Sequence, residues 1–540
     1  MNGERLFQIL GMIDEDLLEE ADSASSAAAS KRRGRALRGL AAACIALVCV
    51  SGAVWMLRGG LAMGGASMAV PGETASDGGS GIAHDTEPLS SEGTTFMSYA
   101  GPVFPLTLTE KTEGLTAERT TTWDFAPDID QNGTSRQWGA HVEDSYLLMN
   151  HTTGEILAMV CYPVAGSLAD LPEEQLTITL DGVEQALTLR AGAYAGGFTH
   201  AGAEDGSTWN LYFPDSWTDY QTLLADGTYT ASAFEAVPEL DVPVTVYEFS
   251  DYILPEYAPD AATQAIEFTI DSEKTSILSY GINGMSWDEN GGWRQYSYFV
   301  PNGVRREDSP KLLVVLGDDI ASYTLQGYED GGCDPGEELE GVSCTVTRYE
   351  TTLDAVLTNL CRQYQERYSQ QWKQDWGMET GLFDLISPEL FRDKATELMT
   401  QYGMLAGDHM TDRYSDGRLS GIISETLTQE RVLYWTFPVT IPAGGSVEIT
   451  ISFEKEPSFD YGCSGSENVG LQGYDYVTQL GSSLVFTEQK AALTNTETIE
   501  ITRQNFGFDL EHGITEVVLN TEQEHYYLEI RPKDQPQHEH

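Results

Sequence analysis

The chain has 540 residues and carries 84 acidic against 30 basic side chains, a formal net charge of −54. Apolar residues make up 41% of it, which is enough for real cores and excludes a wholly disordered or fibrous chain. The negative charge argues against nucleic acid, and against anionic lipid as the partner of the bulk of the chain, because both select basic surfaces. At roughly 150 residues per domain, the length suggests about two to four domains.

An apolar stripe runs through the first predicted helix, over residues 4–21. Its members recur every three or four positions and so share one helical face: Leu6, Ile9, Leu10, Ile13 and Leu17. So short a helix is marginal alone in water. A cytosolic protein, a membrane surface or self-association would each supply the partner that it needs. Residues 1–38 are therefore predicted to be a cytoplasmic segment with an amphipathic start and a basic end.

Residues 39–57 form an uncharged run of 19 residues behind a basic cluster. As a helix this run would span about 28 Å, close to the roughly 30 Å hydrocarbon core of a bilayer. Five basic residues lie within 31–38, and after the run only Arg58 precedes Lys111. The positive-inside rule then predicts a single-pass transmembrane helix with the N-terminus in the cytoplasm and the C-terminal domain outside the cell.

A cleaved signal peptide is the alternative for this segment. Small residues at 67–69 would suit a cleavage site. However, a signal n-region is short and basic, whereas the region before the apolar run is 38 residues long and begins acidic. Both interpretations place the chain beyond about residue 60 outside the cytoplasm. The whole charge imbalance lies there, since residues 59–540 hold 23 basic and 77 acidic side chains.

Composition divides the extracytoplasmic part. Residues 58–96 are rich in Gly, Ser, Ala and Thr, which predicts a flexible stalk. From residue 97 onward, short alternating runs and frequent turns predict a mainly β structure of antiparallel sandwich domains. The clearest hairpin signal is Thr177–Leu189, around an Asp-Gly turn. We predict one β-sandwich domain over 97–260, a second β domain over 261–535, and a tail at 536–540.

A helical hairpin is predicted inside the second β domain, at residues 351–404. Apolar and aromatic residues recur at three or four positions from Leu353 to Trp376. A second helix has a clear start and end, because Ser387 suits its N-cap, Pro388 its first turn and Gly403 its termination. Stripes of this kind usually form core and seldom bind ligands.

Seven cysteines in 540 residues exclude a disulfide framework. One bridge is sterically plausible, between Cys333 and Cys344 across an intervening loop. It would contribute roughly 3 kcal/mol in the chain-entropy model. The alternative is that both are free thiols.

A short acidic motif resembles the first half of a calcium-binding loop. Asp128, Asp130 and Asn132 stand at alternate positions and Gly133 follows, which places three oxygen ligands before a sharp turn. Position twelve of the motif is Gly139, where such loops carry a bidentate Glu. A weak Ca²⁺ site and an ordinary Asx-rich turn both remain open; no other cofactor is predicted.

The sequence contains none of the common hydrolase, metalloprotease or phosphate-binding motifs. Its nine histidines are scattered and give no spaced ligand pair outside the C-terminal tail. We therefore predict no catalytic residue and no enzymatic activity. An envelope hydrolase that uses two of the many carboxylates stays as the lesser alternative.

The order of the N-terminal features is an acidic amphipathic segment, then KRRGRALR, then one membrane helix. This order resembles the anti-sigma-factor-like single-pass membrane proteins of Gram-positive, Clostridia-type bacteria, over about the first 58 residues. The resemblance implies a cytosolic partner for residues 4–21 and an ectodomain that senses the envelope. Residues 1–38 contain no Cys or His, so the zinc-binding type of sigma-binding fold is excluded. The principal hypothesis is a regulatory or sensory membrane protein, and the alternative is a surface-displayed binding or adhesion module.

Overall fold

The computed structural model describes most of the chain after residue 98. The described residues are 99–126, 128–129, 135–136, 139–169, 171, 176–193, 216–237, 239–256, 263–288, 292–300, 310–375, 383, 385–401, 404–405, 417–460 and 470–533. The predicted N-terminal helix, the predicted membrane segment 39–57, the predicted stalk 58–96 and the predicted tail 536–540 lie outside them. No helix within these ranges is long and apolar enough to cross a membrane.

The structure is mainly β, as predicted, and its largest sheet has seven strands in the order β25-β23-β2-β5-β20-β7-β8. The strands of this sheet are β2 (Leu115–Asp124), β5 (Ala140–Asn150), β7 (Thr177–Leu180), β8 (Val183–Glu184), β20 (Ser446–Lys455), β23 (Val485–Thr494) and β25 (Glu516–Val518). All neighbours pair antiparallel except β2 and β23, which are parallel. The Asp181-Gly182 turn joins β7 to β8 with both residues at positive φ, which confirms the predicted hairpin turn.

Two four-stranded sheets accompany the seven-stranded one. Their orders are β1-β6-β19-β9 and β21-β22-β26-β24. The first contains β1 (Thr107–Leu108), β6 (Ile156–Gly166), β9 (Thr188–Ala191) and β19 (Arg431–Ile441), and the second contains β21 (Phe459–Asp460), β22 (Gln472–Val477), β24 (Ile499–Gln504) and β26 (His525–Pro532). We call these three sheets the host β unit. A short pair, β3 (Asp128–Ile129) and β4 (Ser135–Arg136), and the 3₁₀ turn η4 (Thr496–Thr498) complete its described elements.

One apolar core joins the three sheets of the host β unit. It is built from alternate residues of the long strands, such as Val142 and Leu148 on β5, Val160 on β6 and Phe437 on β19. The intervening residues of β6 and β19 form a second core with α4 (Trp217–Leu224) and α5 (Thr228–Ser232). Strand alternation therefore gives β6 and β19 two buried faces where they pack against α4 and α5, whereas the first residues of β6 and the last of β19 have one exposed face.

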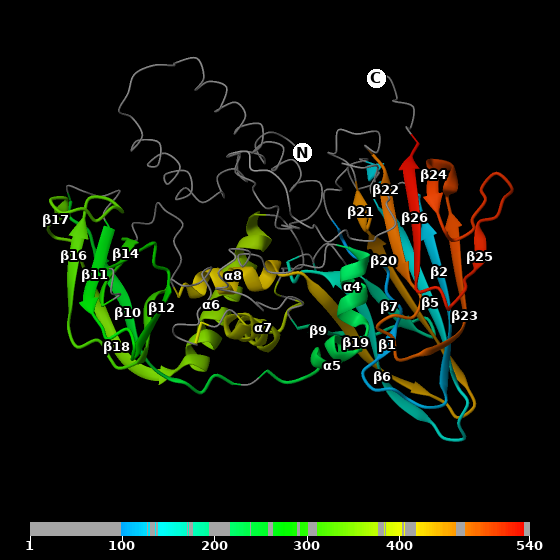
Figure 1. The fold of residues 1–540 in the computed structure, drawn as a ribbon, viewed down its shortest axis with the longest axis horizontal. Coiled ribbons are helices and arrows are strands. Elements are labelled where there is room, and N and C mark those ends of the chain that lie inside the picture. Colours follow the sequence, from blue (N-terminus) through cyan, green and yellow to red (C-terminus); the bar gives the residue numbers. More distant parts are fainter. Residues whose placement is uncertain are drawn as a thin grey trace, which may run out of the picture. The chain divides into compact units, whose positions relative to one another are not determined.

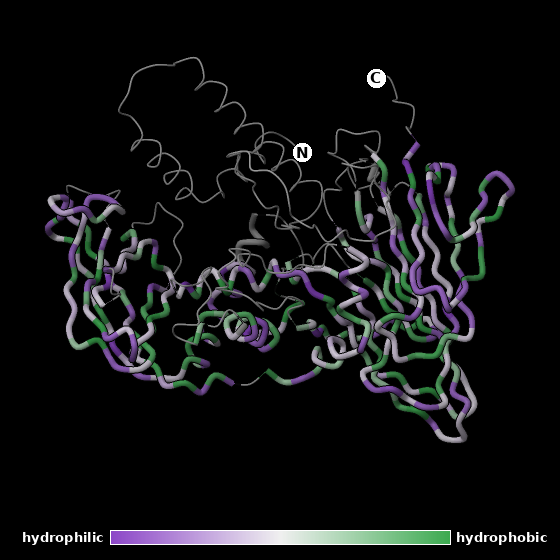
Figure 2. Tube along the Cα trace, viewed as in Figure 1, coloured by the Kyte–Doolittle hydropathy of each residue, from purple (hydrophilic) through white to green (hydrophobic). Residues whose placement is uncertain are grey.

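Residues 243–352 form a separate pair of sheets, the inserted β unit. One sheet has the order β12-β15-β10-β18 and the other β13-β14-β11-β16-β17. The strands are β10 (Pro243–Ile253), β11 (Thr263–Thr269), β12 (Thr275–Tyr280), β13 (Gly284–Trp287), β14 (Trp293–Phe299), β15 (Lys311–Gly317), β16 (Tyr323–Tyr328), β17 (Glu338–Leu339) and β18 (Ser343–Thr352). Apolar residues of both sheets share one core, and hydrophobic and hydrophilic segments interleave along the strands of both β units (Figure 2).

Three helices follow the inserted β unit: α6 (Leu353–Asp375), α7 (Pro388–Gln401) and α8 (Leu419–Thr428). The first two confirm the predicted helices, and the backbone N–H of Leu390 donates to the Ser387 hydroxyl at 3.1 Å, as an N-cap requires. Helix α8 was not predicted, and neither were α4 and α5. The apolar faces of the three helices belong to the same core cluster as the host β unit.

The strand pairing differs from the expected domain boundary near residue 260. Strands from residues 107–191 and from residues 431–532 interleave in the same sheets, so early strands (blue and cyan) neighbour late ones (orange) in Figure 1. Strand β10, which was expected in the first domain, pairs with β15 and β18 of the inserted β unit. The chain therefore builds half of the host β unit, then the inserted β unit and the helices, and then the remaining half.

Candidate functional site

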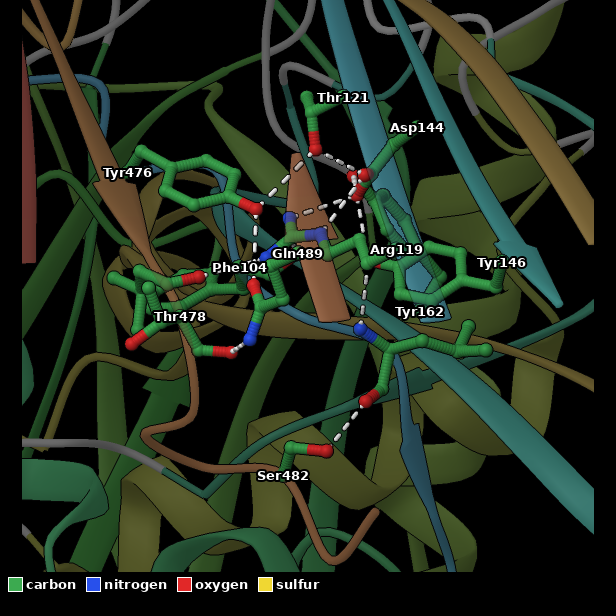
Figure 3. A network of polar contacts seen from close by, with 12 residues as sticks. Phe104, Arg119, Thr121, Asp144, Tyr146, Tyr162, Tyr476, Thr478, Ser482 and Gln489 are labelled. Atoms are coloured by element: carbon green, nitrogen blue, oxygen red, sulfur yellow. Dashed lines mark hydrogen bonds and ion pairs between the residues drawn. The ribbon is translucent and has the colours of Figure 1, made fainter. Parts of the chain in front are cut away.

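Among the described residues, an extensive buried polar network is centred on the ion pair between Arg119 and Asp144 (Figure 3). Arg119 lies on β2 and Asp144 on the adjacent β5, and both side chains are 0% exposed. Nε of Arg119 donates to Oδ1 of Asp144 at 2.9 Å, and Nη2 donates to Oδ2 at 2.8 Å. The guanidinium therefore binds the carboxylate as a bidentate pair through the edge formed by Nε and Nη2, which we call its side-on edge.

The remaining polar atoms of this pair also have partners. Nη1 of Arg119 donates to the carbonyl of Val477 at 2.7 Å, and Nη2 donates to that of Phe104 at 3.0 Å. Asp144 also accepts three hydroxyl hydrogen bonds, from Thr121 (2.6 Å), Tyr146 (2.6 Å) and Tyr162 (3.2 Å).

Burial, and after it the charge of Asp144, raises the pKa of Tyr162 well above its usual value, so that this phenol stays a neutral donor. A buried network with these partners is a structural clamp between sheets, because it leaves no group free for a ligand.

A second polar cluster reaches the surface at β22 and β26. Nε2 of His525 hydrogen-bonds Oδ1 of Asp475 at 2.7 Å, and the hydroxyl of Tyr99 donates to Oδ2 at 2.6 Å. The ring of Trp217 on α4 stacks on the imidazole, with centroids 4.6 Å apart and planes 9° apart. Asp475 is buried, whereas 24% of the His525 side chain is exposed. Of the groups in this cluster, the imidazole is therefore the candidate contact for a ligand.

The chemistry of this cluster favours binding. A carboxylate that orients an imidazole is one half of a nucleophilic site, whose other half is a hydroxyl or thiol on the second ring nitrogen. Among the described residues, no serine, threonine or cysteine hydrogen-bonds the His525 ring. The stacked, hydrogen-bonded imidazole can hold an acidic or aromatic group of a ligand.

The neighbouring Glu529 lies on β26, four positions beyond His525. Arg503 of β24 contacts it at 2.9 Å, yet the Glu529 side chain is only 3% exposed. Burial raises the pKa of this carboxyl, and the charge of Arg503 opposes the shift without cancelling it. The ionised form of Glu529 is therefore disfavoured in the folded protein.

Cys333 and Cys344 are free thiols in the structure, so of the two alternatives left open for them it has the one without a bridge. The sulfur of Cys344 instead accepts a hydrogen bond from the hydroxyl of Tyr298 at 3.4 Å. Cys161 and Cys361 are also free, and burial raises the pKa of each to about 12. Since the thiolate is the reactive form, neither of these two is an activated nucleophile.

The other predicted site residues lie largely outside the described part of the chain. Asp128 belongs to β3, where its backbone pairs with that of Arg136 on β4. Asp130 and Asn132 are not described, and neither are the five residues of the N-terminal stripe. Within the described ranges, no three His, Cys, Asp or Glu side chains are grouped so as to hold a metal ion.

The Arg119 network was not foreseen because strand β2 was not predicted. Its burial alternates along Leu115, Ala117, Arg119, Thr121 and Trp123, so the period was present. Two of these buried positions hold polar residues, Arg119 and Thr121, so the apolar alternation of the strand is interrupted in the sequence. A search for alternation that admits a paired arginine would have found this strand.

Comparison with known proteins places the chain in no established group. No protein-family model matches it, and no curated protein resembles it in sequence.

Proposed function

We propose that this protein is a single-pass bacterial membrane protein of the regulatory or sensory kind, with an anti-sigma-factor-like N-terminus in the cytoplasm and an acidic β-rich domain outside the cell. The observation that carries the proposal is the uncharged run 39–57 behind the basic residues of 31–38. In this arrangement the ectodomain binds an envelope ligand, and the stripe from Leu6 to Leu17 contacts a cytosolic partner.

The chemistry of the described ectodomain supports binding more than catalysis. The polar network of Arg119 and Asp144 has its donors and acceptors paired and buried, and the cluster around His525 offers a stacked imidazole that is partly exposed. Two of the buried thiols of the ectodomain are held in the protonated form.

Two experiments test the membrane and partner parts of the proposal separately. Membrane fractionation with external protease should release an ectodomain fragment from intact cells; a protected C-terminal bulk would contradict the topology. A pull-down with residues 1–38 should recover a cytosolic protein that the Leu10→Asp/Leu17→Asp variant does not recover. The same recovery with both baits would contradict a role for the apolar stripe.

A surface-displayed binding or adhesion module is the second candidate. It is favoured by apolar side chains on the outer side of β6, where Leu157 is 75% exposed and Met159 is 42% exposed. Glycan and protein arrays probed with the full-length protein would identify its target. Binding that survives deletion of residues 1–30, with no effect of that deletion on any cellular response, would favour adhesion over sensing.

A further inference from the structure

A second buried arginine, Arg431, differs from Arg119 in how its guanidinium is satisfied. Arg431 is the first residue of β19 and its side chain is 0% exposed. Nη1 donates to the carbonyl of Gly192, just after β9, at 3.1 Å. The backbone N–H of Gly192 in turn donates to the carbonyl of Val432. The guanidinium is thus fixed at the point where β9 and β19 pair.

The side-on edge of this guanidinium has no protein partner. Nε and Nη2 of Arg431 are both buried and form no hydrogen bond. In Arg119 the same two atoms bind the two oxygens of Asp144. One chain therefore buries two arginines to the same extent, one with a carboxylate on its side-on edge and the other with that edge empty.

The charges around Arg431 leave a positive excess. Lys394 on α7 is 5% exposed, and its Nζ contacts Oε2 of Glu397 at 2.8 Å. Oε1 of Glu397 approaches Nη1 of Arg431 only to 3.8 Å. Burial lowers the pKa of Lys394, and the charge of Arg431 adds to this effect, which places the two cations within electrostatic reach of each other. These three side chains carry two positive charges and one negative charge when Lys394 is protonated. The charge of Asp393 also acts on Lys394, but Asp393 is paired with Arg392 at 2.7 Å.

Other buried polar atoms on the same elements also have no hydrogen-bond partner. Gln429 lies two positions before Arg431, at the C-cap of α8. Both Nε2 and Oε1 of this amide form no hydrogen bond, although Gln429 is 0% exposed. The hydroxyl of Thr396 on α7 is likewise buried and unpaired.

Buried charged N–H groups without a partner are strongly unfavourable, so native proteins satisfy them. The Nε and Nη2 pair of a guanidinium matches two neighbouring oxygens of a carboxylate or a phosphate group. We propose that the fold encloses a small oxyanion of the carboxylate or phosphate class, bound by two oxygens to Nε and Nη2 of Arg431 beside Lys394. The charge of the anion compensates the positive excess. The unpaired amide of Gln429, two positions before Arg431, is a further contact for it.

Because the guanidinium is fully buried, the anion is taken up on folding or through local opening between α7 and the start of β19. An anion that binds only the folded state raises the ratio of folded to unfolded protein by the factor 1 + [anion]/Kd, about a hundredfold at 100 times the Kd. The site would therefore act as a stability switch that responds to the anion. It does not depend on the membrane topology proposed above.

The test uses the full-length protein in detergent, with inorganic phosphate, acetate and chloride compared at matched ionic strength. Two readouts are combined. Ion chromatography after acid denaturation measures the anion that the protein carries as purified, and thermal unfolding measures the response to added anion. We expect wild type either to release one equivalent of oxyanion or to show a Tm that rises with phosphate or acetate but not with chloride.

The variant Arg431→Lys keeps the charge but lacks the two-atom edge, and should lose both signals while remaining folded by circular dichroism. Arg348→Lys, at an exposed arginine of the inserted β unit, is the matched control and should keep both. If Arg431→Lys does not fold, Lys394→Met should weaken the anion response on its own. Wild-type protein that neither releases an oxyanion nor responds to one, or a high-resolution structure with only water on Nε and Nη2, would overturn the proposal.

Discussion

Asp144 accepts hydrogen bonds from five donors, and its charge compensates a buried guanidinium. In Asp144→Asn, the NH2 of the amide would face groups that are themselves hydrogen-bond donors. Arg119 would also lose its counter-charge. Removal of one partner of a buried pair typically costs about 3–5 kcal/mol, far more than loss of an exposed pair. We expect a decrease of that size in the free energy of unfolding, measured by urea denaturation.

Glu350→Gln is the control for this substitution, because Glu350 contacts Arg348 at an exposed site, with 74% of its own side chain in solvent. We expect it to change the stability by less than about 1 kcal/mol. Equal effects of the two substitutions would contradict the role of this network, which reaches Val477 on β22 and Tyr162 on β6, as a clamp between the sheets.

Glu529 gives a pH-dependent prediction at the same scale. Its folded-state pKa is raised, mainly by burial, so its ionised form is disfavoured in the folded protein. The cost is fully present above the folded-state pKa and disappears as the pH falls below the unfolded-state pKa. Glu529→Gln should therefore stabilise the protein at pH 7, and the gain should shrink as the pH falls towards about 4, near the ordinary pKa of Glu.

Chemical denaturation of both proteins between pH 7 and pH 4 would measure this difference. The amide oxygen that Glu529→Gln introduces can still accept a hydrogen bond from Arg503, so the substitution removes mainly the charge. If the stability of Glu529→Gln relative to wild type instead increased on acidification, the ion pair with Arg503, and not burial, would dominate the pKa of this carboxyl.

At the scale of elements, periodic patterns predicted several of the long strands and the helices α6 and α7, but not β2, β23, α4 or α5. Alternation located β5, β6, β10 and β20, and a three-to-four spacing located α6 and α7, because each buries one face. Helix α8 was missed because LSGIISETLT mixes glycine and β-branched residues into a helix buried on several sides. Strand β2 was missed because its inward positions include Arg119, whose partner on β5 cannot be read from local sequence.

Helix α7 offers a test of whether capping determines where it begins. Its N-cap hydroxyl, from Ser387, accepts the N–H of Leu390 at 3.1 Å. Ser387→Ala should cost about 1 kcal/mol, since one of the first N–H groups loses its partner. Thr400→Ala is the control: its hydroxyl bonds the carbonyl of Thr396 four residues back, a contact with little net stabilising effect. Comparable losses for both variants in urea unfolding would argue against the cap.

At the scale of the whole molecule, the expected boundary near residue 260 differs from the observed one because strand pairing is not local. Strand β20 pairs with β5, and β23 with β2, across the entire inserted segment. Local periodicity records which face of a strand is buried but not which strand lies beside it. For the same reason, the free edge of Arg431 could not be seen in sequence, since it depends on the meeting of α7 with β9 and β19.

The ends of the inserted β unit meet. Pro243 is the register partner of Thr352, and the N–H of Leu353 donates to the carbonyl of Val242 at 2.9 Å. The unit also has its own core between its two sheets. These features predict that residues 242–353 fold when expressed alone.

Isolation of this unit would, however, expose the outer side of one of its sheets. Six of its residues belong to the core cluster that includes the helices: Val244, Val246, Leu278, Tyr280, Leu312 and Val314. The hydroxyl of Tyr280 also accepts a hydrogen bond from Arg367 on α6. Without the helices these side chains would form an exposed apolar patch, which drives self-association.

We therefore expect the isolated unit to show β-rich circular dichroism but to elute as oligomers in gel filtration and to bind a hydrophobic dye. Leu278 and Val314 are cross-strand partners on β12 and β15, so Leu278→Lys/Val314→Glu places an opposite-charge pair in the middle of the patch. This variant should elute as a monomer and bind less dye. A wild-type unit that is already monomeric and does not bind the dye would contradict burial of this face by the helices, and an unfolded unit would show that its two-sheet core is insufficient alone.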